Sequence, residues 1–193
     1  MESSKLFDPA TVALVLIDLQ QGIVPLPILA PYSGQAIVQR AAELAAAFRA
    51  VGSPVIYVRV DMGAILALPV DGPMRDPAAP PPPPSASELA PDCGYQVGDG
   101  LVTKRQWGAF HGTDLDQLLR RQGIRTVVLG GIATNFGVES TARSATDLGY
   151  AVVFVEDAMT TVSPELHAFA VQQLFPLMGR VRSAAEVAAG LRR

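Results

Sequence analysis

Three segments of the chain carry side chains or turns that could do chemistry together. Asp18 closes the apolar run 11–17, where a carboxylate must be paired or functional because burying it alone is costly. Lys104 follows the short apolar stretch 101–103. The segment 131–139 (GIATNFGVE) predicts a turn that opens a helix, where backbone amides favour negative charge. An acid, a cation and an anion-binding turn indicate an active site; the alternative for Asp18 is a helix cap.

The use of lysine in this chain singles out Lys104. Of the 15 Lys and Arg residues, only Lys5 and Lys104 are lysines, so arginine supplies nearly all of the positive charge. A compact ammonium differs from a planar guanidinium where a small pocket must be lined. A bias in base composition would also leave a stray lysine, so this observation supports a role for Lys104 only together with its position after an apolar run.

The elements that must position these residues alternate along the chain. Short runs of Val, Ile and Leu predict buried strands, and Ala- and Leu-rich segments that end at glycine predict helices. The expected strands are 11–18, 54–60, 126–130, 151–156 and a short one near 180–182; the expected helices are 35–51, 114–122, 135–148, 163–175 and one from 183. This order predicts an α/β fold, a three-layer, doubly wound and mostly parallel sheet of about six strands with helices on both faces. Ligands bind beyond the carboxyl ends of such strands, where the three segments fall.

The stretch 61–100 interrupts this alternation. It holds nine of the 16 prolines, five of them consecutive in 80–84, and such a run favours an extended conformation. We expect a surface excursion; the alternatives are a flap over the pocket and a segment that reaches a neighbouring subunit. We expect residues 1–193 to form a single domain that includes this loop.

Composition excludes several classes of protein. With 193 residues, 49% hydrophobic, 17% charged and a net charge of −3, the chain is typical of a globular domain with no nucleic-acid or membrane partner. The segment 1–5 lacks the pattern of a signal peptide, which predicts a cytoplasmic location. Cys93 is the single cysteine, so no internal disulfide forms, and we expect an incidental loop residue with little chance of entering the cleft.

The motifs resemble a known family. VLIDLQQGI, the lysine in VTKRQWGAFHGTDL, and GIATNFGVESTARSATDLGY followed by VVFVEDA are similar to the three signature regions of the isochorismatase-like (cysteine hydrolase) superfamily. The resemblance covers about 11–182 apart from the proline-rich loop. It is strongest to bacterial hydrolases that share TN-x-GVESTAR, with glycine in place of the catalytic cysteine.

This resemblance implies an Asp-Lys-Cys triad in which Asp18 and Lys104 match the acid and the lysine. The cysteine position falls on Gly137, which has no side chain. The resemblance also implies a cis peptide bond between Ile132 and Ala133, and an oxyanion hole formed by the amides of Ala133 and Gly137.

The absence of a thiol at position 137 determines which reaction we expect. Amide hydrolysis in this family needs a thiolate nucleophile. The isochorismatase branch also has glycine at this position and hydrolyses a vinyl ether without an enzyme nucleophile. The resemblance therefore implies that Asp18 acts as general acid and Lys104 stabilises charge. A catalytically silent binding protein and a weak, water-driven amidase are the alternatives.

The remaining expectations concern the surroundings of the site. We expect Trp107 and Phe110 to form an apolar wall of the pocket, and Gln20 and Asn135 to contact a small-molecule substrate. His111 and His167 are expected to be a loop residue and a helix-surface residue. No metal or other cofactor is expected; in particular, the segment 60–64 lacks the histidine of the metal site that the resemblance implies for nicotinamidases of this superfamily. Relatives imply a homo-oligomer, a dimer or a tetramer.

Overall fold

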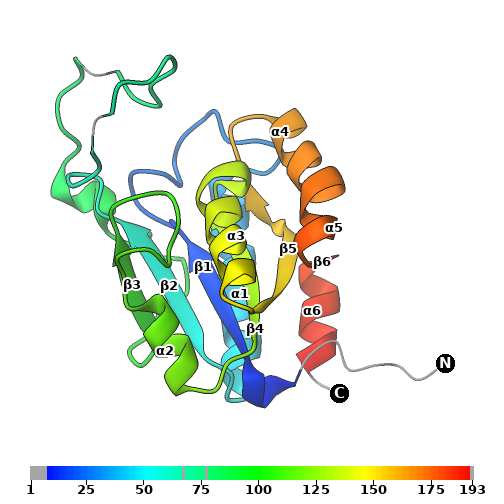
Figure 1. Cartoon of the computed structure of the whole chain (residues 1–193). Helices are drawn as coiled ribbons and strands as arrows, with labels where there is room; N and C mark the ends of the chain where they lie inside the picture. Colours follow the sequence, from blue (N-terminus) through cyan, green and yellow to red (C-terminus); the bar gives the residue numbers. More distant parts are fainter. Residues whose placement is uncertain (1–7, 67, 77, 192–193) are drawn as a thin grey trace.

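A computed structural model describes residues 8–66, 68–76 and 78–191, so the expectation about the segment 1–5 lies outside the described residues. The six strands form one sheet in the order β3-β2-β1-β4-β5-β6, and every neighbouring pair is parallel (Figure 1). The order reverses between the neighbours β1 and β4, which opens a crevice beyond their carboxyl ends. The predicted doubly wound α/β fold is confirmed. The strands are β1 Val12–Ile17, β2 Val55–Val60, β3 Gly100–Lys104, β4 Thr126–Ile132, β5 Ala151–Thr160 and β6 Arg180–Arg182.

Helices cover both faces of the sheet, as Figure 1 shows. One face packs against α1 (Gly34–Ala50) and α6 (Ala184–Leu191), and the other packs against α2 (Leu115–Arg121), α3 (Glu139–Asp147) and the run from α4 (Pro164–Phe169) to α5 (Phe175–Met178). Two 3₁₀ segments, η1 (Pro9–Thr11) and η2 (Pro84–Ser87), and two π-helical segments, η3 (Thr134–Val138) and η4 (Ala170–Leu174), complete the described elements.

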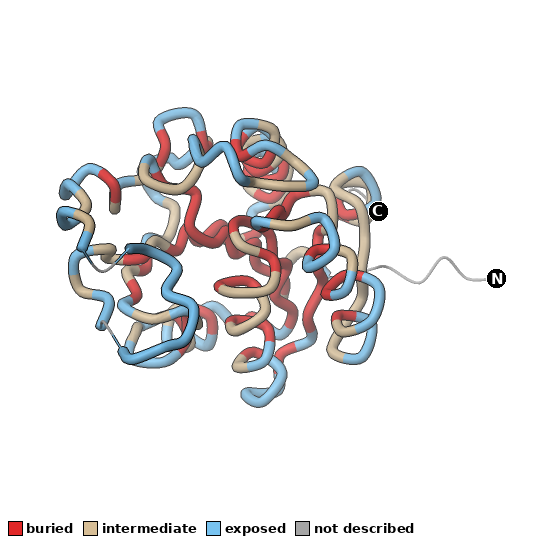
Figure 2. The backbone as a smooth tube through the Cα atoms, turned by 90° about the horizontal axis from the view of Figure 1, so that it is seen from above, coloured by how far each residue is buried: buried red, intermediate tan, exposed pale blue. Residues whose placement is uncertain are grey.

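The core consists of two layers divided by the sheet. Side chains of β1 alternate between the layers: Val15 and Ile17 face α2 and α3, whereas Leu14 and Leu16 face α1. These residues are fully buried, because β1 lies in the middle of a sheet covered on both faces. Figure 2 shows this buried centre surrounded by exposed loops.

The strand β5 continues four residues beyond its predicted end at 156. It pairs again with β4 after a register shift between Leu129 and Gly131, so that Met159 lies opposite Gly131. Gly131 has φ 118°, and a Cβ there would lie 2.1 Å from the carbonyl oxygen of Ile17, so only glycine fits. This close approach brings the end of β4 against the end of β1, where Asp18 begins.

The two halves of the segment 61–100 differ. Residues 63–66, 68–76 and 78–83 project from the body as the loop at the upper left of Figure 1, and Leu66 and Met74 there are strongly exposed. From η2 onward the chain returns to the body, where Ala86, Ala90 and Cys93 are buried, although Val97 is fully exposed. The predicted surface excursion is confirmed for the first half only. None of the described helices is long and apolar enough to cross a bilayer.

Candidate active site

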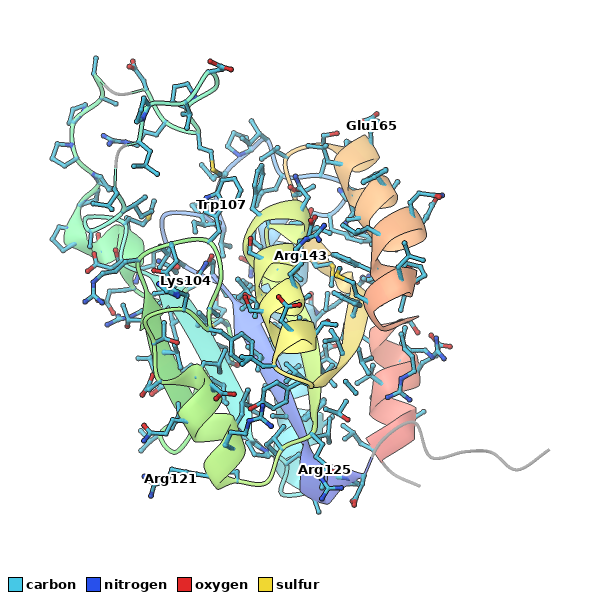
Figure 3. All side chains as sticks on the ribbon, viewed as in Figure 1. Lys104, Trp107, Arg121, Arg125, Arg143 and Glu165 are labelled. Atoms are coloured by element: carbon cyan, nitrogen blue, oxygen red, sulfur yellow. The ribbon has the colours of Figure 1, made fainter. Side chains whose placement is uncertain are left out.

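Asp18 and Lys104 meet at the carboxyl edge of the sheet. Asp18 directly follows β1, and its amide donates to the Val58 carbonyl at 2.8 Å. Lys104 ends β3, two strands away, and its Nζ lies 2.7 Å from Asp18 Oδ2. Both side chains are buried, with exposed fractions of 2% for Lys104 and 8% for Asp18. Figure 3 shows Lys104 near the upper end of the sheet, far from Arg121 and Arg125 at the opposite end.

The environment of Asp18 favours its protonated form. Burial raises the pKa of Asp18 to about 6, although the Lys104 ammonium opposes this rise. Asp18 Oδ2 accepts from Lys104, whereas Oδ1 is buried with no hydrogen-bond partner among the described residues. Near neutral pH this carboxyl can therefore hold or release a proton, as a general acid or base must.

Gly137 lies directly beside this ion pair. A Cβ built on Gly137 would lie 3.1 Å from Asp18 Oδ2, 3.2 Å from Lys104 Nζ and 2.9 Å from Ile17 Cγ2. The structure thus brings together the three positions that the resemblance predicts to form one site, and any side chain at 137 would contact both charged groups. The contact with Ile17 is too close for a carbon, so a larger residue needs Ile17 to move.

A network that the sequence did not reveal holds the turn of Gly137 in place. The buried hydroxyl of Thr141 donates to the Gly137 carbonyl at 2.6 Å and accepts from the Ala109 amide at 3.1 Å. Thr141 therefore ties the turn to the loop that follows Lys104. The bond between Ile132 and Ala133 is cis, as predicted. The oxyanion-hole role of the Ala133 and Gly137 amides stays a prediction.

Gln20 and Asn135 have their side chains engaged within the protein. The Gln20 amide group is fully buried; it donates to the Val60 carbonyl at 2.8 Å and accepts from the Val60 amide at 2.7 Å. Gln20 therefore connects the chain after β1 to the end of β2. Both polar groups of its side chain bind Val60, so this geometry does not support the expected contact with substrate. Asn135 Oδ1 accepts from the Thr161 hydroxyl at 2.5 Å. Its NH₂ group remains a candidate for substrate contact.

The two predicted wall residues have different surroundings. Trp107 is 53% exposed, its carbonyl accepts from Lys104 Nζ at 2.7 Å, and its ring meets Phe136 edge-on at 5.1 Å (Figure 3). Phe110 is 8% exposed and packs in the α2–α3 layer against Tyr150. The contact between Trp107 and Phe136 thus joins the loop after Lys104 to the turn that holds Gly137, whereas Phe110 packs in the core; that Trp107 or Phe110 lines a substrate pocket stays a prediction.

The expectation for His167 was wrong. His167 lies on α4 but is only 8% exposed, and its Nδ1 lies 2.9 Å from the buried hydroxyl of Thr134. Burial lowers the pKa of His167, which favours the neutral ring. No sequence pattern distinguished this side of α4 from the solvent side. His111 is exposed in a loop, as expected.

Cys93 lies away from this site. It packs in the layer of α1, its backbone carbonyl accepts from the Tyr57 hydroxyl at 2.8 Å, and burial raises the pKa of its thiol.

A separate cavity of about 310 Å³ lies beside the ends of β2 and β3. It is lined by Arg59, Glu88 and the proline run, but by neither Asp18 nor Lys104. The described residues contain no group of three or more His, Cys, Asp or Glu side chains that could hold a metal ion.

The fold and the site define a class: a doubly wound α/β protein with a buried acid–lysine pair at the switch point of its sheet. A family model for the isochorismatase domain matches residues 12–186. The chain therefore belongs to the isochorismatase family, whose members are generally hydrolases.

Individual relatives agree with this assignment. The chain is 46% identical over 178 residues to the isochorismatase family protein YecD of Escherichia coli O157:H7, covering 92% of this chain and 94% of YecD. A solved isochorismatase family protein from Burkholderia thailandensis shares 50% identity and a TM-score of 0.89, covering 97% of this chain and 98% of that one. Ureidoacrylate amidohydrolase RutB of Agrobacterium fabrum is 46% identical over 70 residues, which is 36% of this chain and 31% of RutB.

Proposed function

We propose that this chain hydrolyses small enol-ether metabolites of the isochorismate type, with Asp18 as the general acid. The observation that carries the proposal is the buried Asp18–Lys104 pair beside Gly137, a position without a nucleophilic side chain. Among the described residues no cysteine lies there, because Cys93 packs in the opposite layer of the core. A reaction that requires only an acid, a counter-charge and water fits this arrangement.

In this reaction Asp18 protonates the terminal carbon of the enol ether. Water adds to the resulting oxocarbenium ion, and the hemiketal collapses to a keto acid and an alcohol. Lys104 offsets the negative charge left on Asp18 after proton transfer. With a pKa of about 6, Asp18 is protonated in a useful fraction of molecules near neutral pH. Trp107, which is half exposed and whose backbone carbonyl accepts from Lys104 Nζ, provides apolar surface near the acid.

A substrate panel tests this proposal. Purified protein is incubated with isochorismate, simple enol ethers and primary amides, and products are followed by mass spectrometry. We expect hydrolysis of at least one enol ether and a loss of about a thousandfold in Asp18→Asn, within the usual contribution of a general acid. Enol-ether turnover that is unaffected in Asp18→Asn contradicts the acid role; binding without turnover supports the silent binding protein instead.

Amide hydrolysis is the second candidate, because RutB shares 46% identity over a segment of this chain. Restoring a thiol by Gly137→Cys tests it directly, but the built Cβ lies 2.9 Å from Ile17 Cγ2. We therefore pair the substitution with Ile17→Leu, which removes that branching methyl, and use Ile17→Leu alone as the control. A gain in amide turnover supports an amide-shaped pocket, and no gain in the folded variant argues against it.

Self-association and location are part of the same proposal. Leu66 and Met74, in the described parts of the projecting loop, are 76% and 69% exposed, and exposed apolar side chains of this size favour burial in an interface. We propose a homo-oligomer in the cytoplasm, with a small-molecule substrate and no nucleic-acid or membrane partner. A monomeric mass in solution scattering contradicts the oligomer.

A further inference from the structure

The cavity beside the ends of β2 and β3 lies on the face of the sheet opposite the Lys104 side chain. Arg59 and Thr103 line it, and they lie opposite each other in the two paired strands. Arg59 is two positions from Tyr57, which packs in the α1 layer. Lys104 is two positions from Val102, which packs in the other layer. Because side chains alternate along a strand, the sheet separates this cavity from the Lys104 ammonium, and we treat it as a site of its own.

A rigid wall keeps this cavity open. The prolines 82–84 form one side of it, below the loop that rises above β2 and β3 in Figure 1. A proline ring fixes φ and cannot extend to fill the space beside it. Hydrogen bonds hold the chain next to this wall: the Gly22 amide donates to the Ala86 carbonyl at 3.1 Å, and the Met62 amide donates to the Ser87 hydroxyl at 3.0 Å. With about 310 Å³, the cavity is at the lower end of the range for ligand pockets and suits a small molecule.

Groups of both charges line this cavity and keep hydrogen-bonding capacity. Arg59 Nε donates to the Thr103 hydroxyl at 3.1 Å, and Nη1 donates to Glu88 Oε2 at 2.6 Å. Among the described residues, the third guanidinium nitrogen, Nη2, has no partner. Asp61 also lines the cavity; its Oδ1 accepts from the Gly63 amide at 3.2 Å, and its Oδ2 has no partner in the described part of the chain. The lining therefore offers donors on Arg59 and an acceptor on Asp61.

These charges determine which kind of ligand fits. The Glu88 side chain is 57% exposed, and exposed ion pairs contribute little, so Glu88 can release Arg59 at small cost. A ligand carboxylate can then bind the guanidinium through two parallel hydrogen bonds. A simple anion would also meet the Asp61 carboxylate, and a simple cation would meet Arg59. A molecule that carries both a carboxylate and an ammonium avoids both repulsions.

We propose that this cavity binds a small zwitterion, a free α-amino acid with an apolar side chain. The carboxylate of the ligand binds Arg59, and its ammonium binds Asp61. Its apolar side chain packs against the prolines 82–84, whose rings offer apolar surface and no N–H group. This site is distinct from the Asp18–Lys104 pair, so the inference does not depend on the proposed hydrolysis and its tests need no turnover.

A series of related ligands tests the need for both charges on the wild-type protein. L-Leucine, N-acetyl-L-leucine and L-leucinamide share one apolar side chain, but the second lacks the ammonium and the third lacks the carboxylate. By isothermal titration calorimetry we expect L-leucine to bind with a Kd of about 1 mM or below. Each derivative should bind about tenfold more weakly, because one charged group of the site loses its partner. Absence of L-leucine binding, or equally tight binding of either derivative, overturns the proposal.

Substitutions assign the binding to this cavity. Arg59→Gln and Asp61→Asn each remove one charge and keep a polar side chain, so we expect each to weaken L-leucine binding about tenfold. Arg120→Gln is the matched control, because Arg120 pairs with Asp116 at 3.2 Å on α2 and lines no part of the cavity; its affinity should equal that of the wild type. Where Arg59→Gln does not fold, Asp61→Asn provides the test, since Asp61 lies after the end of β2. Wild-type affinity in Asp61→Asn, or in folded Arg59→Gln, contradicts the proposed site.

A crystal structure with L-selenomethionine as the probe locates the ligand directly. The selenium of the ligand gives an anomalous signal that the sulfur atoms of the protein do not give at the selenium edge. We expect one peak beside the prolines 82–84, with the carboxylate of the ligand on Arg59. A peak beside Asp18 and Lys104 instead, or no peak in the cavity at a saturating concentration, would show that the cavity is not the binding site.

Discussion

Two ion pairs of this chain, one partly buried and one buried, have opposite characters. Arg49 and Asp99 form a two-pronged pair at 2.9 and 2.5 Å, and each member has a further backbone partner, the Gly94 carbonyl and the Gln96 amide. The Asp18–Lys104 pair is a single contact that leaves one carboxyl oxygen without a partner.

The comparison shows how the burial of a carboxyl group distinguishes a reactive ion pair from a structural one. Both oxygens of Asp99 are satisfied, and the hydrogen bonds from Arg49 to Asp99 raise the pKa of Arg49, which favours the charged guanidinium. Burial instead raises the pKa of Asp18 to about 6, which places its proton exchange near neutral pH. We therefore expect the first pair to support stability alone, and the second to support activity as well as stability.

Removal of the Asp18 carboxyl should have the largest effect. Asp18→Asn keeps the shape of the side chain but removes the acid, so we expect enol-ether turnover to fall about a thousandfold. Turnover is measured on the panel by mass spectrometry, with far-ultraviolet circular dichroism to show that the variant folds. Full activity in a folded variant would show that the Asp18–Lys104 pair has only a structural role, like the Arg49–Asp99 pair.

Removal of the Lys104 charge should destabilise the fold. Lys104→Met leaves Asp18 buried without its counter-charge, and breaking such a pair costs about 3 to 5 kcal/mol. The loss, measured by urea unfolding, should be greater at pH 8 than at pH 5, because protonated Asp18 needs no counter-charge. An equal loss at both values would show that Asp18 does not change its charge in this range.

The pH dependence of turnover should follow Asp18. Its pKa of about 6 in the folded protein lies above the ordinary value of 3.8, so the acid form persists below pH 6 and disappears above it. For a general acid, we expect kcat/KM to be level below pH 6 and to fall about a hundredfold between pH 6 and 8, tenfold for each unit beyond the pKa. A rise over the same range would indicate that the carboxylate acts as a base.

Loss of one Asp99 oxygen should have the smallest effect. Asp99→Asn removes the charge that holds Arg49, and we expect a loss of about 2 kcal/mol in the free energy of unfolding, typical of hydrogen bonds to charged groups. Turnover should be unchanged, because this pair joins α1 to the loop before β3, away from the site. A matched fall in turnover would show that the two pairs are coupled.

The sequence by itself determined the α/β alternation and the three chemical segments. Apolar runs such as 126–130 and glycine ends such as Gly123 are local signals, so they could be read without knowing the fold. The resemblance then identified Asp18, Lys104 and the glycine at 137 as one site and predicted the cis bond before Ala133.

Only the tertiary structure decided what surrounds those residues. Asp18 and Lys104 are 86 positions apart in the chain, so neither their contact nor the partnerless Oδ1 could be computed from local pattern. The burial of Gln20 and His167 likewise depends on chain segments distant in sequence. Burial and hydrogen bonding are properties of the packed whole, because atoms from several strands and helices create each environment.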